Sequence, residues 1–95
     1  MKKRLIVSPG KNGMRELHVE EMDIPCSDEE LDLSLDNMDI FYFVVSGYGT
    51  LKVEGYIHSL SPQTGVFIPA NSDHYVSNTG NVDMKIIRYY TKGGR

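Results

Sequence analysis

The sequence predicts an all-β protein, an antiparallel barrel of about eight short strands. Apolar and β-branched residues occur in short runs such as residues 41–45, without the three-to-four spacing of an amphipathic helix. Turns rich in glycine, proline and asparagine separate these runs, and the Glu54-Gly55 pair suits a two-residue hairpin. The chain has 95 residues, which is enough for one small core. We therefore predict a single domain over residues 1–95.

Residues 1–30 are expected to supply N-terminal strands and a connector. Residues 5–7 are typical of an edge strand, and a turn rich in glycine and polar residues follows at 8–13. Residues 14–22 alternate and predict a strand with one wet face. Its apolar face would carry Leu17 and Val19, and its wet face Glu16, His18 and Glu20. His18 is therefore expected on the surface, with no role in a site.

Residues 31–90 are expected to form the barrel core, beginning with an alternating stretch. Three leucines at 31, 33 and 35 alternate with Asp32, Ser34 and Asp36, so one face is buried and the other wet. The pattern leaves open which face lines the barrel. Burial of a leucine is worth about 1.5–3 kcal/mol, which favours the leucines inside.

Five short strands follow, then a long one. We predict them at residues 41–45, 50–53, 56–60, 66–68, 74–78 and 82–90. Residues 91–95 are expected to be a flexible tail.

Three residues at the turn into the fifth of these strands have a distinctive spacing. Pro69, His74 and Asn78 match the second motif of the cupins, G-x5-P-x-G-x2-H-x3-N, and the stretch 31–90 resembles that family. Gln63 and Asn71 stand where the motif has glycines. Both positions lie in turns, and Asn tolerates positive φ better than most residues. The resemblance implies the cupin barrel, a jelly-roll-like antiparallel double-stranded β-helix.

The first cupin motif, G-x5-H-x-H-x3–4-E-x6-G, is only partly present. Gly47 matches its last glycine, but Ile40 occupies the position of the metal-binding glutamate. The two histidine positions fall on Ser34 and Asp36 in one register, or on Leu33 and Leu35 in the other. Catalytic zinc and non-haem iron sites generally use three protein ligands, so we expect no metal cofactor.

The alternative is a divalent transition metal, iron, manganese, nickel or zinc. Its ligands would then be His74, Asp36 and His58. Without a metal, we expect a small polar or sugar-like ligand in the barrel mouth, contacted by His74, Tyr42, Asp36 and Tyr75.

The resemblance leaves three classes of function open, because the cupin fold carries many activities. The first is a metal-free module that binds, senses or sequesters a small molecule. The second is a metal-dependent enzyme of the sugar-phosphate isomerase or dioxygenase type. The third is a dimerisation or interaction domain with a vestigial pocket.

Composition limits the partners and the setting. A net charge of −3 and a pI near 5.5 give no electrostatic footprint for nucleic acid, and no apolar run approaches the length of a membrane span. The single cysteine, Cys26, and the lack of a signal-peptide pattern point to the cytoplasm. A homodimer is expected because Phe41, Phe43 and Val45 form a second apolar face, and because the last strand is apolar on both faces.

Overall fold

The structure is a computed structural model that describes residues 2–7, 17–27 and 29–93. These residues form nine β-strands and no helix, so the described part of the chain contains no helix that could cross a membrane. The strands are β1 (Lys2–Val7), β2 (Leu17–Ile24), β3 (Leu31–Asp32), β4 (Met38–Ser46), β5 (Gly49–Val53), β6 (Tyr56–Leu60), β7 (Gly65–Ile68), β8 (His74–Ser77) and β9 (Met84–Lys92). The predicted all-β class is confirmed.

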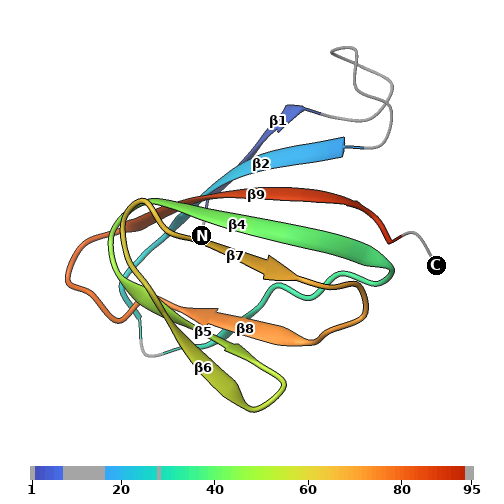
Figure 1. Cartoon of the computed structure of the whole chain (residues 1–95). Helices are drawn as coiled ribbons and strands as arrows, with labels where there is room; N and C mark the ends of the chain where they lie inside the picture. Colours follow the sequence, from blue (N-terminus) through green and yellow to red (C-terminus); the bar gives the residue numbers. More distant parts are fainter. Residues whose placement is uncertain (1, 8–16, 28, 94–95) are drawn as a thin grey trace.

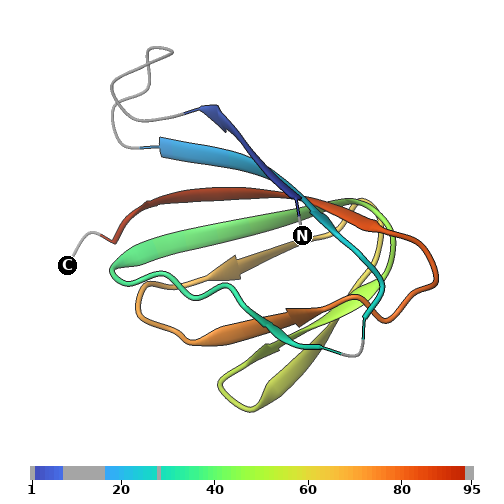
Figure 2. The ribbon, with the colours of Figure 1, turned by 180° about the vertical axis from the view of Figure 1, so that it is seen from behind.

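The strands make two antiparallel sheets that face each other across one core. The five-stranded sheet has the order β1-β2-β9-β4-β7, and the four-stranded sheet has the order β3-β8-β5-β6. Figure 1 shows the first sheet above the second, and Figure 2 shows the same two layers from behind. This is the jelly-roll arrangement that the sequence predicts.

The predicted strands between residues 41 and 78 are confirmed, with small changes at their ends. The last strand differs more, because β9 includes Thr91 and Lys92, which were expected in a flexible tail. Pairing of β9 with β4 explains the difference: Lys92 lies opposite Met38, and the Gly93 amide donates to the Asn37 carbonyl at 2.6 Å. The predicted turn at 8–13 lies outside the described residues.

The turns have the backbone that their residues suggested. Glu54 and Gly55 both have positive φ, 48° and 83°, as a two-residue type I′ hairpin requires. Gln63 and Asn71 also have positive φ, 67° and 65°. Both therefore keep a left-handed backbone at positions where glycine would adopt it without strain.

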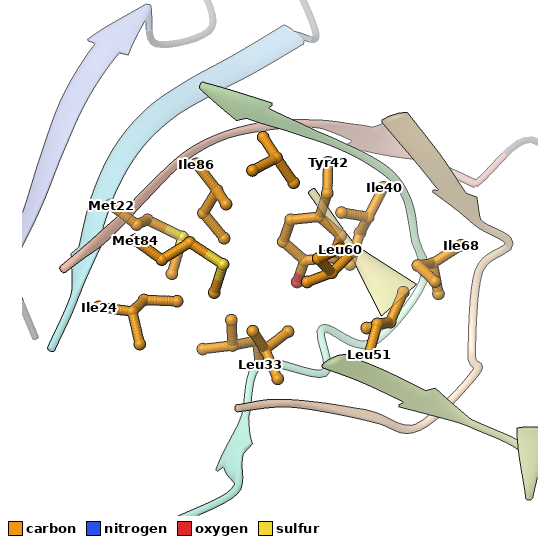
Figure 3. Close-up of a cluster of buried hydrophobic side chains, with 12 residues drawn as sticks. Met22, Ile24, Leu33, Ile40, Tyr42, Leu51, Leu60, Ile68, Met84 and Ile86 are labelled. Carbon is orange, nitrogen blue, oxygen red and sulfur yellow. The ribbon is translucent and has the colours of Figure 1, made fainter. Parts of the chain in front are cut away.

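The core fills the space between the sheets. Its most deeply buried members come from seven of the nine strands and from the segment after β3: Met22, Ile24, Leu33, Ile40, Tyr42, Val44, Leu51, Leu60, Ile68, Val76, Met84 and Ile86. Figure 3 shows Tyr42 among them, with its hydroxyl directed into the cluster. The barrel is thus packed with side chains.

The alternating leucine stretch has its leucines inside. Leu33 is 8% exposed and belongs to the core, while Asp32 and Asp36 are exposed. Only Leu31 and Asp32 pair as a strand, with Val76 and Tyr75 of β8. This outcome follows from the greater gain of burying leucine than of burying an unpaired carboxylate.

The predicted wet face of the second strand is wrong in its N-terminal half, although Val19 is buried as predicted. Glu20, expected on the wet face, is only 7% exposed and lies on the same face as the buried Met22 and Ile24. Arg88 of β9 stands directly opposite Glu20, so the buried carboxylate has a cationic partner. His18, also on this face, is half-buried instead of solvated.

Candidate functional site

Tyr42 and His74 meet in the barrel interior. The Tyr42 hydroxyl lies 2.6 Å from Nε2 of His74, and Nδ1 of His74 lies 3.1 Å from the Ser72 carbonyl. Because a carbonyl only accepts, Nδ1 carries the proton, and Nε2 accepts from the Tyr42 hydroxyl. His74 is 0% exposed, so both ring nitrogens are satisfied by the protein itself.

Ser34 fixes the backbone of His74. Its Oγ accepts from the His74 amide at 2.8 Å and lies 3.3 Å from the His74 carbonyl. The serine side chain therefore joins the leucine stretch to the start of β8, beyond the two residues of β3 that pair with it.

A buried ion pair lies beside this histidine. Arg88 donates from Nε and Nη2 to Oε1 of Glu20, at 3.0 and 2.5 Å, and from Nη1 to the Leu33 carbonyl at 3.1 Å. Arg88 also stands directly opposite Tyr42 in the β4–β9 register. We call Glu20, Arg88, Tyr42 and His74 the polar network.

The surroundings shift the proton affinities of three members of the network. Burial raises the pKa of Tyr42 to about 12, against the opposing charge of Arg88. Burial also lowers the pKa of His74, and the charge of Arg88 adds to that effect. Burial is the largest single influence on Arg88 and lowers its pKa, but the hydrogen bonds and charges of Glu20 and Tyr42 together outweigh burial, and the pKa of Arg88 is raised. At neutral pH the network therefore holds a neutral His–Tyr pair beside a charged Glu–Arg pair.

Two aromatic rings extend the network toward the strand ends. His18 stacks on Tyr90 with ring centroids 4.4 Å apart, and the guanidinium of Arg88 lies 5.0 Å from the centre of the Tyr90 ring. Tyr90 is half-buried, and burial raises its pKa. Lys3 reaches the other oxygen of Glu20 at 3.9 Å from a partly exposed position.

The residues present do not fit a transition metal. Leu33 and Ile40 are buried core residues, and both nitrogens of His74 are engaged. Within the described residues no group of three or more His, Cys, Asp or Glu side chains lies close enough to hold an ion. A metal would need donors that this interior lacks.

The structure brings only two of the predicted site residues together. His74 and Tyr42 are in contact, whereas Asp36 is exposed in a turn. Tyr75 follows His74 on β8 and so faces outward, where it lines a hollow of about 400 Å³ with Lys52 and Asp73. His58 stands opposite Leu51 on the inner face of β6, but its side chain is exposed.

A larger hollow lies where β5 and β8 approach the connector after β2. Its volume is about 1040 Å³. It is lined by Cys26, Ser27, Glu29, Glu30, Thr50, Ser77, Asn78, Thr79 and Gly80. Neither His74 nor any other member of the polar network lines it.

Asn78 forms a fixed part of this hollow. It is 3% exposed; its Nδ2 donates to the carbonyls of Ile24 and Val82, both at 2.8 Å, and its Oδ1 accepts from the Gly80 amide at 2.9 Å. This asparagine therefore ties the connector after β2 to the turn before β9.

The sequence reasoning missed the roles of Glu20, Arg88, Tyr90 and His18. One signal was present: Arg88 shares a strand face with Met84 and Ile86, and an arginine on an apolar face needs a buried anion. Glu20 lies on a strand whose last inward residues, Met22 and Ile24, are apolar. Continuing the alternation of that strand backward from Ile24 and Met22 would have placed Glu20 on the buried face.

Comparison with known proteins identifies the family. Residues 28–90 match the family model described as Cupin domain. The chain belongs to the cupin family. The match covers the whole stretch 31–90 in which the sequence resemblance was found, and it includes Pro69, His74 and Asn78. No curated protein matches the chain in sequence.

Solved cupin-like structures share its fold. The BH2720 protein of Bacillus halodurans is 25% identical, with a TM-score of 0.75 over 84% of this chain and 65% of that one. The cupin domain of Schizosaccharomyces pombe Cnp3 is 8% identical, with a TM-score of 0.82 over 95% and 63%. KdgF from a Halomonas species is 16% identical, with a TM-score of 0.79 over 97% and 78%. The chain thus spans slightly less than two thirds of the first two structures.

Proposed function

We propose that this cupin is a binding module for a small polar or sugar-like molecule and that it works without a metal. The observation that carries the proposal is the polar hollow beside Asn78, together with a barrel interior that its own side chains fill. A volume of about 1040 Å³ is at the upper end of the range of about 300–1000 Å³ typical of ligand sites. We expect the protein to be cytoplasmic and its single cysteine, Cys26, to be reduced.

The lining of the hollow suggests the ligand chemistry. Ser27, Thr50, Ser77 and Thr79 supply hydroxyls that donate and accept, and the carboxylates of Glu29 and Glu30 only accept. This set suits a ligand with several hydroxyl or amino groups. Two carboxylates disfavour an anion, although Lys52 lies 3.6 Å from Glu30. We therefore favour neutral or cationic sugars over sugar phosphates.

This preference separates the binding module from the metal enzyme. An isomerase of sugar phosphates needs cationic groups for the phosphate and, in the metal-dependent cupins, a bound ion. The hollow offers carboxylates, and the interior offers one histidine with both nitrogens engaged. The enzyme reading therefore has less support than the binding reading.

Thermal melting with a ligand panel tests the proposal. The panel would contain neutral monosaccharides, amino sugars, polyols and sugar phosphates. A bound ligand at about 100 times its Kd adds about 2.7 kcal/mol, which corresponds to a rise of several degrees in Tm. We expect neutral or amino sugars to raise Tm and sugar phosphates to have no effect.

Two matched variants test whether the ligand that raises Tm binds in this hollow. Ser77→Ala removes a hydroxyl that lines the hollow, and Ser59→Ala removes an exposed hydroxyl from β6, outside its lining. The ligand-induced rise in Tm should shrink in Ser77→Ala and persist in Ser59→Ala. The proposal fails if no compound in the panel raises Tm, if sugar phosphates raise it most, or if the two variants behave alike.

A further inference from the structure

Strand β6 forms an open edge of the four-stranded sheet, with β5 as its one neighbour in the described structure. The two-residue hairpin makes Val53 and Tyr56 a hydrogen-bonded pair, so the next such pair is Leu51 with His58. The residues between them alternate with these pairs. The backbone N–H and C=O groups of Ile57 and Ser59 therefore point away from β5, toward the open edge.

The other sheet edges of the described structure carry features that discourage pairing. Strand β1 has three cations, Lys2, Lys3 and Arg4, and an irregular register between Leu5 and Val7. Strand β3 has two residues, and β7 has four and is followed by Pro69. Charged residues, bulges, prolines and short length are the usual means of protecting an edge. Strand β6 has five residues with no Lys, Arg, Asp, Glu or Pro among them, and its register with β5 is regular.

The exposure of large hydrophobic side chains also points to β6. Tyr56 is 73% exposed and Ile57 is 68% exposed, the two highest values among the large hydrophobic side chains of the described residues. They are adjacent, so apolar side chains accompany the free backbone groups at this edge. Edge geometry and apolar exposure thus point independently to β6 as an interaction surface.

We propose that β6 pairs antiparallel with β6 of a second copy of this chain, about a two-fold axis at His58. In this register Ile57 faces Ser59 of the partner subunit, and the outward N–H and C=O groups of the two residues meet in hydrogen-bonded pairs. Tyr56 faces Leu60 of the partner subunit. The two four-stranded sheets become one continuous eight-stranded sheet.

The self-complementarity of the strand is the reason for choosing a second copy as the partner. The residues with free backbone groups flank His58 symmetrically, as an isologous two-fold contact requires. The strand contains no Lys, Arg, Asp or Glu, so self-pairing brings no side chains of these four types face to face. Strand β1 paired with itself would oppose cations. This interface differs from the outer face with Phe41, Phe43 and Val45 on which the expected homodimer was based.

Charge substitutions at His58 test the proposal. Its side chain is exposed, so His58→Lys and His58→Asp leave the core intact, but each sets two like charges face to face across the axis. By sedimentation equilibrium we expect a dimer for the wild type. For each variant we expect a dissociation constant raised at least about tenfold, which shifts the protein toward monomer. An equimolar mixture of the two variants should recover the dimer mass, because lysine then faces aspartate. Circular dichroism confirms that each variant is folded.

Two further variants sharpen the result. Ser59→Pro removes an outward N–H without removing a bond to β5, and it should also weaken the dimer. Phe43→Asp places a charge on the outer face of the five-stranded sheet, and it should leave the dimer unchanged. The proposal is overturned if the wild type is monomeric, which would leave β6 open for an extended peptide. It is also overturned if the mixture stays monomeric, or if Phe43→Asp abolishes the dimer while the His58 variants keep it.

Discussion

Removing one partner of the Glu20–Arg88 pair should cost much of the stability of this fold. The guanidinium donates twice to Oε1 of Glu20, at 3.0 and 2.5 Å, and the two residues are 7% and 3% exposed. Breaking a buried ion pair from one side costs about 3–5 kcal/mol, because the remaining charge is left buried. A domain of 95 residues has a total stability of about 5–14 kcal/mol. Glu20→Met or Arg88→Met should therefore remove about a fifth of that stability or more.

The double variant tests whether the two charged residues stabilise the fold through contact with each other. When both residues become methionine, no charge remains buried, and replacement of a buried pair by apolar residues is often neutral or stabilising. We expect Glu20→Met/Arg88→Met to be close to wild type and far more stable than the sum of the single losses implies. A strongly non-additive cycle is the signature of direct contact.

Urea denaturation followed by far-UV circular dichroism measures these values, since the chain has no tryptophan. With an m-value of about 1–3 kcal/mol/M, each single variant should lower the midpoint by at least about 1 M. Single losses below about 1 kcal/mol would show that water reaches the pair in solution. A double variant as unstable as the sum would show that the two side chains act independently. Either result would refute the buried network.

Four other expectations follow from the same geometry. Because the pKa of His74 is lowered in the folded protein, the unfolded chain takes up this proton at a higher pH. Stability, measured as the urea midpoint, should therefore fall as the pH drops below about 6.5. His74→Asn should reduce this pH dependence. Tyr42 should titrate near pH 12 in the ultraviolet spectrum, and Tyr42→Phe should remove that step. Protein purified without a metal column should contain far less than one equivalent of metal by elemental analysis, and added Zn²⁺ or Fe²⁺ should not raise Tm. Gly47→Ala should lower Tm sharply, because φ is 90° and the new Cβ would lie 2.7 Å from Cα of Met84.

The strand pattern of this chain was predictable because it depends on local chemistry. Runs of aromatic and β-branched residues, and turns such as Glu54-Gly55, determine strands and hairpins over a few residues. The inward orientation of Leu33 followed from burial alone. The second cupin motif also has a local meaning here, since Gln63 and Asn71 adopt the positive φ that its glycines would supply.

The site was harder to predict because its members meet through long-range pairing. Glu20 and Arg88 are far apart in the sequence, and a charge on a strand face is read as solvated unless its partner is known. Asp36 was predicted as a site residue because it falls on a histidine position of the first cupin motif, but the leucines occupy the inner face and Asp36 is exposed. The hollow beside Asn78 is built from three separate segments of the chain, so no local sequence pattern predicts it.

The polar network also bears on where this cupin can bind a ligand. A polar molecule that entered the interior would have to break hydrogen bonds of 2.5–3.1 Å among Glu20, Arg88, Tyr42 and His74, and it would leave buried groups unpaired. Each such unpaired group costs about 1–3 kcal/mol, and more when it is charged. The contacts of the ligand would have to compensate for that loss before any net binding. The hollow beside Asn78 carries no such penalty, since its rim hydroxyls and carboxylates already face solvent. Binding there would leave the network intact, which supports the proposal that a ligand binds in this hollow and not in the filled interior.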